Sequence, residues 1–304
     1  MALLLAGALS PLSAVADSTA VFYEALAPYG NWMEVGNYGY CWQPKNESPD
    51  WQPYRDGEWT ITEAGWAWIS HEPFGWAVYH YGRWLKVENM GWVWVPGTTW
   101  APAWVSWRQG GAYIGWAPLP PEAIFRAHTG ISRWSDAYFG IGPGHYRFVR
   151  SSELHCGDVA SQLIPVAQSA SVMRQTENVT QIMESHDLVQ NAGPNVKLLA
   201  NGTTAVRRLR LAIHTGSEAG KPMWEEAGTL HVRVLDLKDP NHSAPPTVNK
   251  TFSHPVFDFG WNHMGRASQI SQLRFQILNE ARAFVERGWS GVLPLREEGA
   301  PASP

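Results

Sequence analysis

Histidines and carboxylates are the residue types in this sequence that could carry catalysis or hold a metal ion. The 11 histidines include no His-Glu-x-x-His motif and no other recognised ligand spacing. His71 and His80 would meet only if neighbouring segments brought them together. No Gly-x-Ser-x-Gly nucleophile elbow is present either. We therefore expect no metal site and no cofactor, and the sequence favours a non-catalytic protein.

Carboxylates could still form a hydrolytic site. A glycosidase needs two of them at a defined separation across a cleft, and spacing along a sequence does not establish that separation. Solvated carboxylates in turns are the favoured interpretation. A hydrolase acting on envelope polysaccharide or peptidoglycan is the alternative, with its histidines or carboxylates at the junction of the two halves of the chain. The carboxylates concerned are Asp50, Asp56, Glu58, Glu63 and Glu72.

Tryptophan shows the clearest pattern, because 14 of the 18 tryptophans lie between Trp32 and Trp116. The stretch GEWTITEAGWAW returns as GRWLKVENMGWVW with one residue inserted, and weaker copies stand on either side. A fixed period of this kind indicates an array of one supersecondary unit. The copies are 30–42, 57–68, 82–94 and a half-unit at 111–118.

The repeated unit is predicted to be an antiparallel β-hairpin. Trp66 and Trp68 are two residues apart, as are Trp92 and Trp94, which is the period of a strand. The intervening segments are rich in Gly, Pro, Asn, Asp and Ser, which form turns. A helix would place glycines in its interior at a cost of roughly 1 kcal/mol each. We expect a Trp-walled sheet or small sandwich over residues 20–121.

Both faces of these strands are apolar, which leaves two interpretations. The tryptophans fill a core, where their indole N–H groups need acceptors such as the carbonyls of turns. Alternatively, one face exposes them as a stacking platform for sugar rings or peptides. The platform would consist of Trp66, Trp68, Trp92 and Trp94, with Tyr79, Tyr81 and Arg83 as polar tips. Glycans of the cell wall or matrix, or another envelope protein, would be the partners.

The N-terminus predicts export. An apolar run over residues 1–9 is too short to span a bilayer. Ala14 and Ala16 provide the small residues of a secretory cleavage site, so residues 1–16 read as a signal peptide that lacks the usual positive charge before the apolar run. The expected location is periplasmic or extracellular. The rest of the chain has no long apolar run, so we expect no integral membrane span, and a net charge of −4 argues against nucleic acid as a partner.

Two cysteines, Cys41 and Cys156, occur in the sequence. In an oxidising compartment they could pair, and closing so long a loop would stabilise the fold by about 4–5 kcal/mol. Two buried thiols without a bond are the equal alternative.

Six motifs in fixed order resemble a family of exported bacterial proteins that is rich in tryptophan and glycine and has no assigned biochemical function. The resemblance is specific over residues 22–121 and continues more weakly to about residue 211. It implies an envelope location and a repeat-built β domain, and it supplies no catalytic residues. The motifs are PYGNW (28–32), GWAW (65–68), YHYGRW (79–84), GWVWVPG (91–97), WAPAWV (100–105) and GWAPLPP (115–121).

Residues 122–293 have a different composition and are predicted to form a smaller α+β region. Short strands are expected near 146–149, 171–173, 181–183, 187–189 and 230–234. Residues 268–287 form the best predicted helix, because apolar residues recur along one face and Gly288 ends it. A disordered tail is expected at 294–304. The whole chain is therefore predicted to be mainly β, with tandem Trp-rich hairpins, an α+β region and a C-terminal helix.

Overall fold

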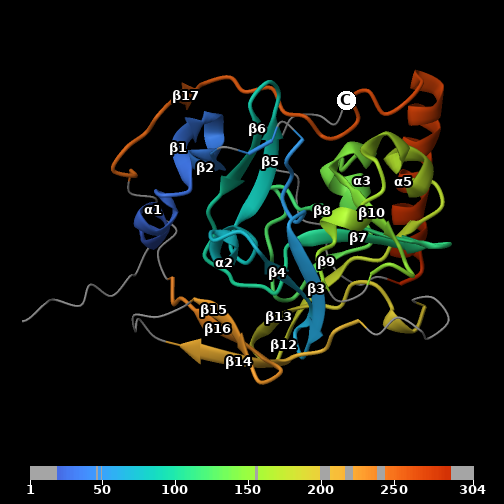
Figure 1. Cartoon of the computed structure of the whole chain (residues 1–304). Coiled ribbons are helices and arrows are strands. Elements are labelled where there is room, and N and C mark those ends of the chain that lie inside the picture. Colours follow the sequence, from blue (N-terminus) through green and yellow to red (C-terminus); the bar gives the residue numbers. More distant parts are fainter. Residues whose placement is uncertain are drawn as a thin grey trace, which may run out of the picture.

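The computed structural model describes residues 19–45, 47–48, 50–154, 157–198, 206–215, 222–237 and 244–288. Within these residues the protein is mainly β, with 17 strands in four sheets and a long helix near the C-terminal end (Figure 1). This confirms the predicted fold class. The predicted signal peptide, the predicted tail and Cys156 lie outside the described residues.

Four antiparallel hairpins form the first half of the described chain, and they confirm the predicted unit. The half-unit at 111–118 is the second strand of a complete fourth hairpin. The hairpins are β1 (Gly30–Val35) with β2 (Tyr40–Pro44), β3 (Gly57–Thr62) with β4 (Gly65–Ser70), β5 (Arg83–Val87) with β6 (Gly91–Val95), and β7 (Val105–Gly110) with β8 (Tyr113–Pro118).

Each hairpin carries two tryptophans directly opposite one another. Directly opposed residues of an antiparallel pair have their Cβ atoms close together, and the rings of Trp59 and Trp68 and of Trp107 and Trp116 are in contact. A further register pair, Trp42 with Trp94, joins the first hairpin to the third in one sheet. The sequence repeat is therefore a repeat of cross-strand ring pairs. The pairs are Trp32 with Trp42, Trp59 with Trp68, Trp84 with Trp94, and Trp107 with Trp116.

These tryptophans form one aromatic core shared by all four hairpins. The opposite face of the first and third hairpins is covered as well: Met33, Cys41 and Val93 are buried there against Phe252 and Phe257 from the C-terminal part of the chain. The apolar faces had left open whether a sheet is covered on both sides or exposes aromatic rings on one. The sheet of the first and third hairpins is covered on both sides.

Most of the later strands extend the hairpin sheets, and three of them form a small sheet of their own. The strand orders are β17-β1-β2-β6-β5, β10-β8-β7-β11 and β3-β4-β13-β12-β9, with β14-β16-β15 as a small fourth sheet. Residues after 121 are thus built onto the hairpins. Their strands are β9 (Ile131–Ser132), β10 (Arg147–Arg150), β11 (Glu177–Asn178), β12 (Gln181–Ser185), β13 (Leu188–Asn191), β14 (Arg210–Thr215), β15 (Met223–Glu226), β16 (Thr229–Val234) and β17 (Thr251–Phe252).

The helix α5 (Ala267–Glu286) confirms the predicted C-terminal helix. It buries Leu273, Ile277 and Ala281 in a second core and ends before Gly288, whose φ is +104°. In Figure 1 it stands at one side of the molecule, beside α3. The strand predicted near 171–173 is wrong, because that segment is helical. The other helices are α1 (Val21–Leu26), α2 (Gly75–Val78), α3 (Ser135–Phe139) and α4 (Ser169–Met173).

In the described part of the chain, every helix is too short or too polar to cross a bilayer.

Candidate functional site

The residues predicted to form an aromatic platform lie in the core. Trp66, Trp68, Trp92 and Trp94 are at most 4% exposed, and Tyr79 and Tyr81 at most 1%. Rings that are this deeply buried have no face to offer to a ligand. Of the two interpretations of the tryptophans, packing is therefore the one that the structure has.

Six of the buried indole N–H groups donate to backbone carbonyls, as expected for a packed aromatic core, whereas those of Trp32, Trp59 and Trp68 have no acceptor among the described residues. Trp94 donates to Tyr81 O at 2.7 Å, and Trp66 donates to Pro194 O at 3.0 Å. Arg83, the remaining predicted site residue, is half-buried and places its guanidinium 3.4 Å from the ring centroid of Trp104. These contacts give the predicted site residues structural roles.

His71 and His80 do not converge. His71 is exposed and its Nδ1 lies 2.9 Å from Asp56 Oδ1. His80 is buried, with its Nδ1 2.9 Å from Ala101 O, and burial lowers the pKa of its imidazole to about 4. Neither histidine lines the cavity along helix α5 or the smaller cavity beside Tyr38 and Phe257.

The five carboxylates considered in the sequence each have a structural partner. Asp50 binds Arg55, Asp56 binds His71, Glu58 binds Arg207, Glu63 accepts a hydrogen bond from Leu211 N, and Glu72 accepts from Trp51 and Tyr79.

Glu72 is the most perturbed of these carboxylates. Trp51 Nε1 donates to its Oε1 at 2.8 Å, and the Tyr79 hydroxyl donates to its Oε2. Burial raises the pKa of Glu72 to about 7, although both hydrogen bonds favour the ionised form. A carboxyl with this pKa is suited to acid–base chemistry, but Glu72 lines neither the cavity along α5 nor the one beside Tyr38.

Asp56, His71 and Asp158 could together offer three ligand atoms to a metal ion, since these atoms lie within 4.8 Å of one another. All three side chains are exposed, and exposed acidic groups often gather without an ion. Cys41 is buried in β2, and burial raises the pKa of its thiol to about 12. Its predicted pairing with Cys156 involves a residue outside the described ones.

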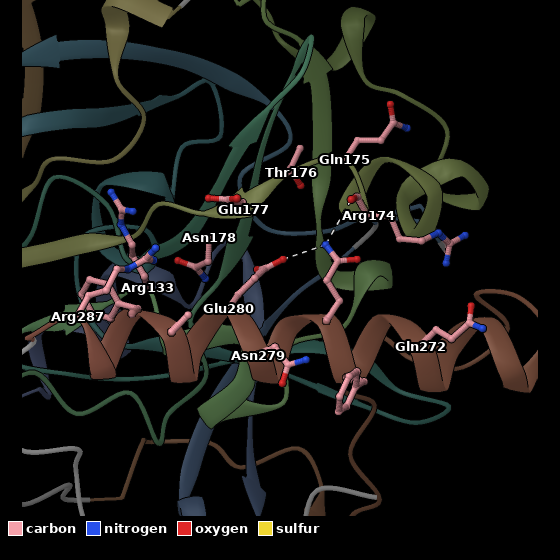
Figure 2. Close-up of a pocket in the computed structure, with 14 residues that line it drawn as sticks. Arg133, Arg174, Gln175, Thr176, Glu177, Asn178, Gln272, Asn279, Glu280 and Arg287 are labelled. Carbon is pink, nitrogen blue, oxygen red and sulfur yellow. Dashed lines mark hydrogen bonds between the residues drawn. The ribbon is translucent and has the colours of Figure 1, made fainter.

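A groove of about 640 Å³ runs along α5, and we call it the α5 groove. One wall is a face of α5, formed by side chains that recur three and four residues apart along the helix. The other wall is the segment 174–178, which contains the edge strand β11 (Figure 2). Arg133 completes one end. The helix side chains are Gln272, Phe275, Gln276, Asn279, Glu280, Ala283, Phe284 and Arg287.

A buried ionic cluster fixes the floor of the α5 groove. Arg108 on β7 is fully buried and bonds Asp136 Oδ2 at 2.7 Å and Glu280 Oε2 at 2.8 Å. Tyr146 and Ser106 each donate to Asp136 Oδ1 at 2.7 Å. A buried charge is stable only when it is paired and hydrogen-bonded, so this cluster holds α5, α3 and β7 together beneath the groove.

Glu280 belongs to both the cluster and the groove. Its side chain is 18% exposed, and burial raises its pKa although Arg108 acts in the opposite direction. Gln276 Nε2 donates to the other carboxylate oxygen, Oε1, at 2.9 Å. Because its charge is met by Arg108, Glu280 presents little free negative charge to the groove.

Three arginines surround the groove, and the salt bridges of the described residues include none of them. Figure 2 shows Arg133 and Arg287 toward one end and Arg174 toward the other. All three side chains are exposed. Glu177 is the only exposed carboxylate among the lining residues of the described groove.

The groove could not be recognised in the sequence, because its residues are ordinary surface types spread over three segments. The predicted helix supplied one usable signal: amides recur at Gln272, Gln276 and Asn279 on a face next to the apolar stripe. The opposite wall is set by the pairing of β11 with β7, which no periodicity in the sequence indicates.

The fold and the groove define a mainly β protein with an aromatic hairpin core and a polar groove at one helix. Residues 23–123, about a third of the chain, match a family of unknown function (DUF6600). The match covers all four hairpins and supports the resemblance to a domain without assigned function. No curated protein and no solved structure matches the chain.

Proposed function

We propose that this protein is a non-catalytic binding module of the cell envelope that holds a glycan chain in the α5 groove. The observation that carries the proposal is the groove itself. Its volume of about 640 Å³ lies in the range of ligand sites. It follows α5 from Gln272 to Arg287, roughly 22 Å at the helical rise per residue. A site of that length suits a linear polymer. The export expected from residues 1–16 would bring the protein to such polymers.

The lining of the groove matches the chemistry of sugars. Gln175, Gln272 and Asn279 are exposed side-chain amides, each with donors and an acceptor. Sugar hydroxyls also donate and accept, so they pair with amides in either direction. Phe275 is 63% exposed beside these amides, and its ring can cover an apolar sugar face.

The tryptophan hairpins act as the scaffold in this proposal. Their rings are buried and packed against one another, so they hold β7 in place, and β7 pairs with β11, which forms one wall of the groove. In this proposal the glycan binds in the α5 groove and not at the predicted aromatic platform.

Titration calorimetry with peptidoglycan fragments and with neutral and acidic polysaccharides tests the proposal. A tryptophan introduced by Ala283→Trp would fill the groove and should abolish binding. Leu278→Trp is the matched control, because Leu278 is exposed on the same helix outside the groove lining. Binding that survives Ala283→Trp, or no binding to any of these glycans, contradicts the proposal.

The same mixtures distinguish binding from hydrolysis. A binding module leaves the number of reducing ends constant during long incubation with polysaccharide. A steady rise that Glu72→Gln abolishes would instead support the hydrolase alternative, because Glu72 is the carboxylate with a pKa near neutrality.

A further inference from the structure

We infer that the ligand of the α5 groove is an acidic glycan, one that carries carboxylate groups such as a polyuronate. This inference rests on the proposed function and adds the charge of the ligand. It follows from the arginines around the groove and from the way in which the floor is neutralised.

The chain as a whole is acidic, with 23 Lys and Arg against 27 Asp and Glu. Elsewhere Arg55, Arg108 and Arg207 each bind a carboxylate. Arg133, Arg174 and Arg287 have none in the described structure, yet all three line one groove. Three free cations at a single groove of an acidic protein form a local site for negative charge.

The floor beneath them does not cancel this charge. Glu280 points to the groove, but its Oε2 is bound to Arg108 and its Oε1 to Gln276. Asp136 is buried and shares the same Arg108 at 2.7 Å. The groove and its floor hold four arginines and three carboxylates, so their net charge is +1. These residues are Arg108, Arg133, Arg174 and Arg287, with Asp136, Glu177 and Glu280.

The geometry suits carboxylates at intervals along a chain. Arg133 and Arg287 lie toward one end of the groove and Arg174 toward the other, with amides between them (Figure 2). A guanidinium binds a carboxylate through two parallel hydrogen bonds, which is a stronger contact than one with a neutral hydroxyl. Arg133 is also placed over the ring of Phe284, 5.8 Å from its centroid. A polymer that carries both hydroxyls and carboxylates offers a hydrogen-bond partner to the amides and to the arginines of the groove.

The decisive measurement compares polygalacturonate with its methyl-esterified form, which has the same backbone without the charge. Titration calorimetry with the full chain should show roughly tenfold tighter binding of the charged polymer, the effect of one charge-assisted contact. Raising the salt from 50 to 200 mM should weaken the charged polymer only.

Single variants locate the effect. Arg174→Gln and Arg287→Gln should each reduce affinity for polygalacturonate several-fold and flatten its salt dependence, and leave the esterified polymer unchanged. Arg282→Gln is the matched control, since Arg282 is exposed on α5 and does not line the groove.

Equal binding of the two polymers overturns the acidic-ligand inference and leaves the proposed function intact. Binding of neither polymer overturns both. An equal loss with Arg282→Gln, or tighter binding of poly-glutamate or duplex DNA than of polygalacturonate, also overturns the inference, because the groove would then not select an acidic glycan.

Discussion

Trp59 on β3 and Trp107 on β7 pack ring against ring with their centroids 4.4 Å apart, although they belong to different hairpins and different sheets. Trp59 also contacts the rings of Trp66, Trp68 and Trp116. It therefore stands where the second and fourth hairpins meet.

The first prediction concerns this contact. Trp59→Ala should lower the free energy of unfolding by about 3–5 kcal/mol, because it leaves a large cavity among rigid rings. Trp59→Phe should cost less. Denaturant titration measures both. Phe275→Ala serves as the control, because a side chain that is 63% exposed contributes little to the core. Equal losses for Trp59→Ala and Phe275→Ala would show that Trp59 is not central.

The second prediction concerns the buried pair of Arg108 and Asp136. Asp136→Ala should destabilise the fold by about 3–5 kcal/mol, since it leaves Arg108 with only Glu280 to balance its charge. Glu280→Gln should cost less, because Glu280 is partly exposed.

A double variant tests the cause of that loss. In Arg108→Met with Asp136→Leu, no buried charge of the pair is left uncompensated, so the loss should be smaller than the sum of the single losses. Additive losses in denaturant titration would mean that the two side chains act independently.

The third prediction concerns pH and Glu72. Its pKa is raised in the folded state to about 7, whereas the unfolded chain keeps the ordinary value near 4.5. The protonated carboxyl is favoured by folding, so stability is full below about pH 4.5 and falls as the pH rises through 7. The loss is about 3 kcal/mol.

Glu72→Gln removes this titration. Relative to the wild type, the variant should gain stability between pH 5 and pH 8, as followed by unfolding at each pH. Taking the difference of the two proteins cancels His80, whose lowered pKa reduces stability as the pH falls from about 6.5 to about 4. A difference that stays constant with pH would show that Glu72 is ionised throughout.

The fourth prediction concerns Gly65, at the turn of the second hairpin. Its φ is +84°, and a Cβ there would lie 2.0 Å from Asn191 O, where β13 joins β4. Gly65→Ala should therefore cost more than the roughly 1–2 kcal/mol of left-handed backbone strain alone. Gly228→Ala isolates that strain, since Gly228 has a φ of +75° and no neighbour within 4 Å. Thermal unfolding of the two variants would contradict the prediction if their losses were equal.

The hairpins could be predicted because their signal is local. Trp66 and Trp68 alternate with small residues, and glycines occupy turn positions such as Gly65 with positive φ. Helix α5 was predictable for the same reason, since Leu273, Ile277 and Ala281 recur at helical spacing. The segment 171–173 was wrongly predicted, because three apolar or small residues are too few to separate the period of a strand from that of a helix.

The candidate site could not be predicted in this way. Arg108 reads in sequence as an exposed strand residue, and its burial depends on Asp136 and Glu280, which are distant along the chain. The groove arises only where α5 passes the edge strand β11. Residues that pair across a long stretch of sequence show no periodic pattern from which the pairing could be predicted.

The sequence by itself thus determined the hairpins, the strand spacing of the tryptophans within them and the C-terminal helix, because strand and helix periods and turn chemistry act over a few residues. Only the tertiary structure decided that the tryptophans of the hairpins are buried in a core and not exposed on one face of a sheet. Strands from the second half close the sheets around them, since burying that much aromatic surface is the largest favourable term available to the fold. With the rings enclosed, the polar groove beside α5 is the surface at which we propose that a ligand binds.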